Sequence, residues 1–108
     1  MKSRLFACLL LLLFATVSVA DEKIKALIID GQNNHGDWPK NTALMKQRLE
    51  ESGKFTVDIE RSKYLWNGGK HFPKYALHDE EYELGKKAKT DPDFKPQFAK
   101  YDVTTLAA

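Results

Sequence analysis

One stretch of the sequence constrains the fold more than any other: residues 23–53 combine a buried strand, a polar loop and a helix. The strand is predicted from Lys23 to Ile29, and its centre, residues 26–29, is continuously apolar. A strand that is apolar on both faces is typical of a parallel sheet covered by helices. Its length, its two isoleucines and the Asp-Gly pair that follows favour a strand over a short buried helix.

A helix is predicted over about residues 39–52, where four side chains spaced by four, three and four residues form one helical stripe. This stripe consists of Trp38, Thr42, Met45 and Leu49. Asp37 is the expected N-cap, with Asn41 or Thr42 as alternatives. Gly53 fits the position directly after the helix, where a left-handed residue is common.

The next segment, Phe55 to Glu60, alternates strictly between apolar and polar side chains, as a half-exposed strand near a sheet edge does. Strand, helix and strand within this length form a βαβ unit with parallel strands. Residues 101–108 then predict a third strand. The predicted fold class is α/β, with a parallel sheet of about three strands and one firm helix, too few elements to cover both faces.

The middle of the chain is less regular. Residues 64–69 contain a turn signal, and residues 90–96 have the composition of a turn. Between them, the charges of residues 79–89 suit the dipole of a short helix. A long connection without firm structure is unusual in a small domain, so residues 63–90 are interpreted as an insertion.

The N-terminus has the pattern of a secretory signal peptide. Lys2 and Arg4 precede an apolar run, and a small-residue cleavage pattern ends at Ala20. The alternative is a membrane anchor, but the run of about 13 residues is shorter than the roughly 20 that span a bilayer. We therefore expect a secreted or periplasmic protein, cleaved after Ala20, with no membrane attachment afterwards.

Cleavage would change the charge and the cysteine content. The chain has 17 basic and 15 acidic residues, and the signal removes Lys2 and Arg4, which leaves 15 of each. A neutral chain argues against general nucleic-acid binding, which needs a basic face. Cys8 is the only cysteine and leaves with residues 1–20, so the mature part has no disulfide or cysteine metal site.

The loop at residues 30–38 is where a site is expected, because ligands of open α/β sheets bind beyond the carboxyl ends of the strands. Asp30 and His35 are the catalytic candidates. The ligand-binding candidates are Gln32, Asn33, Asn34, Asp37 and Trp38. The N–H groups at the start of the following helix favour an anion or oxyanion in the same space.

Each candidate also has a structural alternative. Asp30 would simply end the strand, and the amide side chains would hydrogen-bond the loop. Asp37 would cap the helix, and Trp38 would pack beneath the helical stripe instead of stacking on a ligand. No motif of a phosphate loop, zinc protease or serine hydrolase is present, so the cofactor is unknown.

Two further groups lie in the middle of the chain. A metal site is conceivable from His71, His78, Asp79 and Glu80, but their spacing is weak support and we predict no metal. The second group consists of aromatic residues that would form a binding patch. The alternative is that these residues only cover the core. The aromatic residues are Tyr64, Trp66, Phe72 and Tyr75.

Residues 23–62 and 91–103 resemble the opening of trehalose-utilisation (ThuA-like) domains. The resemblance lies in the apolar strand, the Asp-Gly-Gln-Asn-Asn-His loop, the helix, the Phe-Thr-Val strand and the Lys-Tyr-Asp-Val start of the third strand. It implies a flavodoxin-like fold related to class I glutamine amidotransferases and a link to carbohydrate metabolism. By position it points to Asp30, Asn34, His35 and Trp38. ThuA-like domains continue beyond the matched region, so a truncated or frame-shifted domain is expected.

Three functions follow as expectations. The first is an exported ThuA-like protein that binds a sugar-like small molecule at the end of the first strand, where His35 would act as acid, base or metal ligand. The second is a non-catalytic carbohydrate-binding or interaction module that uses the aromatic residues. The third is a fragment without independent function. A partner chain that completes the sheet is a further hypothesis.

Overall fold

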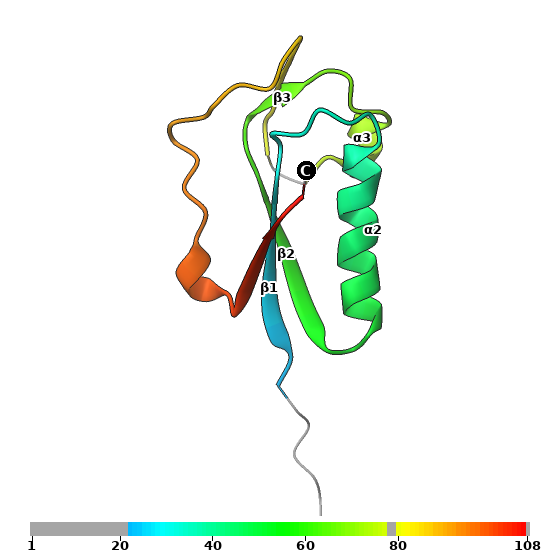
Figure 1. The fold of residues 1–108 in the computed structure, drawn as a ribbon, viewed down its shortest axis with the longest axis vertical. Coiled ribbons are helices and arrows are strands. Elements are labelled where there is room, and N and C mark those ends of the chain that lie inside the picture. The colour runs from blue at the N-terminus through cyan, green and yellow to red at the C-terminus, as the bar shows by residue number, and fades with distance from the viewer. Residues whose placement is uncertain (1–21, 78–79, 108) are drawn as a thin grey trace, which may run out of the picture.

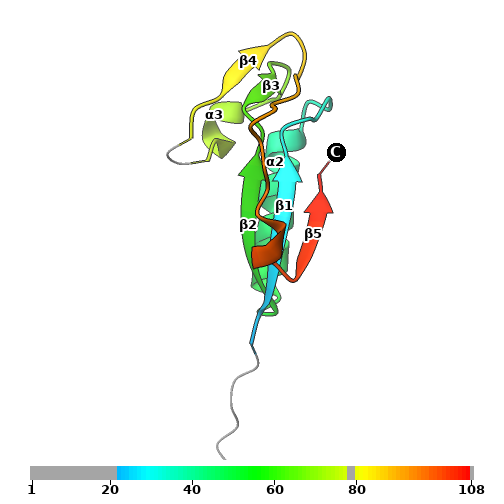
Figure 2. The same ribbon diagram turned by 90° about the vertical axis from the view of Figure 1, so that its left-hand side faces the viewer.

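The centre of the fold is β1 (Ile24–Asp30), which lies between two parallel neighbours in the computed structural model (Figures 1 and 2). The structure describes residues 22–77 and 80–107. β2 (Phe55–Arg61) pairs with β1 along its whole length, and β5 (Val103–Leu106) pairs with residues 26–29. The sheet order β2-β1-β5 confirms the predicted parallel α/β class of about three strands.

The two faces of this sheet are covered differently. Figure 1 shows α2 (Trp38–Glu51) on one side and the connection from β4 to β5, coloured yellow to orange, on the other. Ala26 and Ile28 form the core under α2 together with Val57, and Leu27 is also fully buried. The sequence therefore predicted correctly that β1 is buried on both faces and that α2 joins β1 to β2.

The buried stripe of α2 differs in part from the prediction. Trp38 and Thr42 are buried and Leu49 is half-buried, as expected, but Met45 is exposed. Lys46 is half-buried instead, because its ammonium group donates a hydrogen bond to the carbonyl oxygen of Val57 and pairs with Glu50. A long aliphatic stem allows lysine to occupy the helix–sheet boundary while its charged end stays hydrated.

The C-terminal end of α2 agrees with the prediction, and the N-terminal end does not. Gly53 has a φ of +74°, and its N–H donates to the carbonyl oxygen of Glu50 over 3.0 Å, as expected for a residue that ends a helix. Asp37 precedes the helix, but its side chain makes no capping hydrogen bond. Its φ of −92° and ψ of 9° differ from the extended conformation that lets an N-cap side chain reach back.

Residues 63–90 contain a second, smaller sheet. β3 (Tyr64–Trp66) and β4 (Glu83–Gly85) pair in parallel, with α3 (Phe72–Tyr75) between them in sequence. The helix predicted over residues 79–89 is therefore wrong: residues 80–89 contain no helix and residues 83–85 are a strand, while residues 78–79 lie outside the described part. Backbone pairing decides this, since the N–H of Asn67 donates to the carbonyl oxygen of Gly85 over 2.7 Å.

The small sheet lies beyond the carboxyl ends of the large one, as Figure 2 shows. The connection from β4 then passes down the sheet through a short 3₁₀ helix, η1 (Phe98–Lys100), before β5 begins. This arrangement places the residues around β3 and β4 above the loop that follows β1. Within the described residues, no helix is both long and apolar enough to cross a membrane.

A buried ion pair joins the ends of β1 and β2. Arg61 donates from Nε to Oδ1 of Asp30 over 2.7 Å and from Nη2 to Oδ2 over 2.9 Å, and both side chains are at most 1% exposed. A third hydrogen bond from Nη1 reaches the carbonyl oxygen of Tyr75 over 2.9 Å. A two-bond contact between guanidinium and carboxylate is the strongest form of such a pair.

Aromatic rings enclose the guanidinium group of Arg61. Its central carbon lies 4.8 Å from the ring of Trp38, 5.9 Å from that of Phe72 and 5.8 Å from that of Tyr82. Burial, together with a hydrogen bond to Glu80, raises the pKa of Tyr82 above its usual range. These rings exclude water from the ion pair and add cation–π attraction.

We predict that Asp30→Ala lowers the free energy of unfolding by about 3–5 kcal/mol, because it leaves the Arg61 charge buried without a partner. Urea unfolding followed by circular dichroism would measure the loss. Replacing both partners, Asp30→Leu with Arg61→Met, should recover most of it, since no uncompensated charge remains.

The pair of Lys46 and Glu50, whose side chains are 40% and 43% exposed, provides the matched control. Glu50→Gln should cost less than about 1 kcal/mol, because water screens exposed ion pairs. Equal losses for Asp30→Ala and Glu50→Gln would contradict the structural importance of the buried pair.

Candidate functional site

The loop after β1 turns sharply at Gly31, whose φ is +107°. A Cβ atom at this position would lie 2.3 Å from Oγ of Ser62, so only glycine fits without displacement of a neighbour. Asn33 then holds the turn, because its Oδ1 accepts the Gly31 N–H over 2.8 Å and its Nδ2 donates to the carbonyl oxygen of Ala107. The loop is therefore held against Ala107, the residue that follows β5.

A pocket of about 340 Å³ lies between this loop and the turn that follows β4, and we call it the carboxyl-end pocket. It is lined by Gln32, Asn33, Asn34, Trp66, Lys86, Lys87 and Ala88. Its position beyond the end of β1 is where open α/β sheets bind ligands. Its volume falls at the lower end of the range for small-molecule sites.

The polar groups that line the carboxyl-end pocket differ in whether they are available to bind a ligand. Asn33 is buried, and both ends of its amide group are already bonded, to Gly31 in the loop and to Ala107 after β5. Gln32 donates from Nε2 to Oγ of Ser62 and to the carbonyl oxygen of Lys89, which leaves its Oε1 as an acceptor. Asn34 is exposed and makes no side-chain hydrogen bond to another described residue. Asn34 and Oε1 of Gln32 are therefore the loop groups available to a ligand.

The other wall of the pocket comes from the small sheet. Trp66, at the end of β3, is half-buried, and its ring packs against Gly68, where a Cβ atom would lie only 1.9 Å from the ring. Lys86 and Lys87 add two exposed ammonium groups. Sequence reasoning assigned these lysines to a helix and did not connect them with the loop. The Trp-Asn-Gly-Gly turn was the available signal, because it places a tryptophan at a strand end.

The predicted aromatic patch does not form as one surface. Phe72 lies in the cluster around Arg61, with its ring centre 6.0 Å from that of Trp38. Tyr75 lines a groove beside α2, and Tyr64 faces a different, smaller pocket. Of the four aromatic residues, Trp66 alone lines the carboxyl-end pocket.

The two catalytic candidates are not brought together. Both carboxylate oxygens of Asp30 bind Arg61, and the side chain is fully buried. His35 is exposed on the same loop, but it is not among the residues that line the carboxyl-end pocket. The geometry therefore gives Asp30 a role in packing and leaves His35 without a catalytic partner in this pocket.

Neither of the two remaining candidate residues of the loop, Trp38 and Asp37, lines the carboxyl-end pocket. Trp38 is 2% exposed and packs against Arg61 and Phe72, so its ring faces offer no surface for a ligand. This is the structural alternative raised from the sequence. Asp37 is exposed, outside the lining of the carboxyl-end pocket.

The metal hypothesis gains no support from the described residues, which contain no group of three or more potential ligands. His71 and Glu80 are both exposed. The other two residues of that hypothesis, His78 and Asp79, lie outside the described part of the chain.

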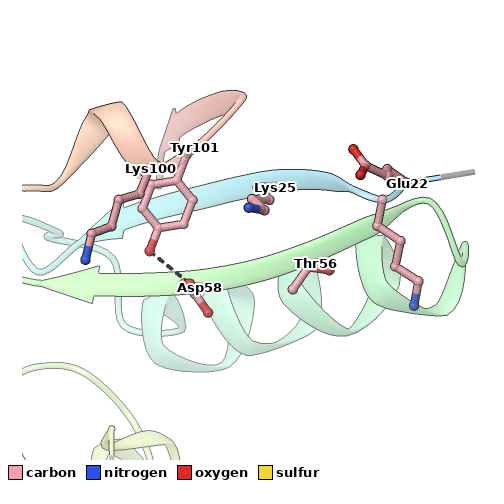
Figure 3. A pocket seen from close by; sticks show the side chains of 7 residues that line it. Glu22, Lys25, Thr56, Asp58, Lys100 and Tyr101 are labelled. Carbon is pink, nitrogen blue, oxygen red and sulfur yellow. Dashed lines mark hydrogen bonds between the residues drawn. The ribbon is translucent and has the colours of Figure 1, made fainter.

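A larger pocket, of about 640 Å³, lies at the opposite end of the sheet (Figure 3). Lysine and acidic side chains line it, and the hydroxyl of Tyr101 donates to Asp58 over 2.9 Å. Burial and this hydrogen bond raise the pKa of Tyr101 to about 12. We favour the carboxyl-end pocket as the site, since the amino ends of parallel strands are not where such sheets bind ligands.

No protein-family model, curated protein or solved structure matches this chain. The fold and the site define a class: a small parallel α/β protein with a polar pocket at the carboxyl end of its first strand.

We predict that Gly31→Ala lowers the free energy of unfolding by more than about 2 kcal/mol, through an unfavourable φ and a collision with Ser62. Gly53→Ala is the matched control, because its φ is also positive but no atom lies within 4 Å of the added Cβ. It should cost about 1 kcal/mol. Urea unfolding measures both, and equal losses would contradict the close approach at Gly31.

Proposed function

We propose that this chain is an exported ThuA-like protein that binds a sugar-like molecule in the carboxyl-end pocket without converting it. The observation that carries the proposal is the meeting of Trp66 with the amide groups of Gln32 and Asn34. An indole ring offers a flat apolar face, and side-chain amides can both donate to and accept from hydroxyl groups. A sugar ring matches both groups, because it has an apolar face and a rim of hydroxyl groups.

Lys86 and Lys87 extend the recognition that this pocket offers. Each ammonium group has three donors and no acceptor. Such groups would bind sugar oxygens, and an anionic substituent would bind more tightly still. The pocket is therefore better suited to a hydroxylated ligand than to an apolar one.

Binding is favoured over catalysis because no carboxylate or imidazole is among the described residues that line the pocket. General acid–base chemistry needs a titratable group within hydrogen-bond reach of the reacting atom. Asp30 is held by Arg61, and His35 does not line the pocket. The favoured function is thus closer to the binding module than to the enzyme among the three expectations.

The family and export proposals rest on the sequence. The strand, loop and helix that resemble ThuA-like domains are β1, the loop and α2, and the parallel sheet suits the implied flavodoxin-like class. Export is supported by residues 1–20, with their basic start, apolar run and cleavage pattern at Ala20. Those residues lie outside the described part of the structure.

We predict that the purified protein binds trehalose or its constituent glucose, with a change in tryptophan fluorescence, and that Trp66→Ala weakens binding at least tenfold. Trp66→Phe should retain most of the affinity, because it keeps a flat ring. Isothermal titration calorimetry and fluorescence titration would measure both variants. Circular dichroism would establish that they fold.

His35→Ala separates the two functional hypotheses. Unchanged binding in His35→Ala, with loss in Trp66→Ala, supports a non-catalytic module. Loss of binding in His35→Ala, with folding intact, would favour a catalytic site on the loop. Saturation with neither sugar, in a protein that unfolds cooperatively, would contradict the sugar proposal.

A further inference from the structure

The two edge strands of the large sheet, β2 and β5, differ in the charged residues they carry. At the β2 edge, Lys46 reaches over from α2 and donates to the carbonyl oxygen of Val57. β2 also carries the charged residues Asp58, Glu60 and Arg61. A lysine bonded to an edge carbonyl and charged side chains along the strand are common means of preventing edge-to-edge association.

The β5 edge, which we define as residues 103–106, has no such protection. The sequence from Val103 to Ala108 is Val-Thr-Thr-Leu-Ala-Ala and contains no charged residue. Val103 is 48% exposed and Leu106 is 75% exposed. β5 pairs with β1 on one side, and no described strand pairs with its other side. An uncharged, apolar edge with free backbone groups is a template for another strand.

We propose that the β5 edge pairs antiparallel with the β5 edge of a second copy of this chain, about a two-fold axis that passes through Thr105. The pairing would join two three-stranded sheets into one sheet of six strands. Closed two-fold dimers are the commonest symmetric assembly, and the same patch serves both subunits. Asp102, the nearest charge, is engaged within its own chain, because its carboxylate accepts the N–H of Lys25 over 2.8 Å.

The backbone of β5 selects this register. Ala107 donates its N–H to the carbonyl oxygen of Ile29 over 2.9 Å, so the alternate residues Thr104 and Leu106 direct their backbone groups away from β1. An axis through Thr105 places Thr104 opposite the partner's Leu106. Each such pair exchanges two hydrogen bonds, so all the outward backbone groups of residues 104–106 find partners.

The side chains suit the same arrangement. Thr104 and the partner's Leu106 lie on one face, and the two Thr105 side chains meet on the other, so no like charges face each other. Leu106 also borders an apolar cavity of about 320 Å³, with Ile29, Phe94 and Ala107. Pairing would reduce the exposure of this apolar surface, which is the main favourable term in association.

A cysteine placed on the axis gives a direct test. In a Cys8→Ser background, Thr105→Cys should form a disulfide-linked dimer under mild oxidation, because the facing Cα atoms would be about 4.5 Å apart. Thr104→Cys is the matched control, since its symmetry mate is diagonal, about 7–8 Å away. We expect most of the Thr105→Cys protein to cross-link and little of the Thr104→Cys protein. Equal cross-linking at both positions, or none at Thr105, would overturn the proposal.

Sedimentation velocity of the unmodified sequence tests the assembly without a cross-link. A short strand edge buries little area, so dimer is expected at a protein concentration of about 100 µM. Leu106→Lys should reduce the dimer fraction at least fivefold, whereas Met45→Lys, at an exposed apolar position of α2, should leave it unchanged. A monomer at this concentration, whether or not a different polypeptide can occupy the edge, would show that β5 is not a self-association surface.

Discussion

The buried ion pair of Asp30 and Arg61 is the interaction on which the other parts of the structure depend. It joins the carboxyl ends of β1 and β2, and through the carbonyl oxygen of Tyr75 it also fixes α3. Trp38 from α2 and Phe72 from α3 pack on the same guanidinium group. One arginine therefore holds the small sheet region onto the large one, and the surrounding rings keep water from competing for the carboxylate.

This pairing also decides the chemistry that the loop can offer. Both oxygens of the Asp30 carboxylate bind the guanidinium group of Arg61, and Asp30 does not line the carboxyl-end pocket. What remains near the end of β1 is a set of amides, ammonium groups and one indole ring. The ligand binding that we propose rests on these groups. The contrast between the β2 and β5 edges is independent of this pocket, so the proposed ligand binding and the proposed self-association can be tested separately.

Local pattern was sufficient to predict the βαβ unit. The apolar run of β1, the alternation of β2 and the glycine after α2 each have one favourable local structure, and the sheet satisfies all three. The sequence pattern gave a wrong prediction at residues 83–85. The distribution of charged residues suggested a helix there, but backbone pairing with β3 forms a strand. The pattern also misjudged Met45, which is exposed, while the neighbouring Lys46 is half-buried and bonded to the carbonyl oxygen of Val57. In both cases a contact distant in sequence outweighed a weak local preference.

The sequence by itself determined that this is a parallel α/β protein with a polar loop at the end of its first strand, because periodicity and turn residues act locally. Only the tertiary structure decided which loop residues are free. Asp30 and Trp38 look like site residues in sequence, but Arg61, 31 residues after Asp30, packs against both. Trp66 lines the carboxyl-end pocket because the pairing of β3 with β4 places it beside the loop. Burial and partnership are properties of distant neighbours, and no local pattern encodes them.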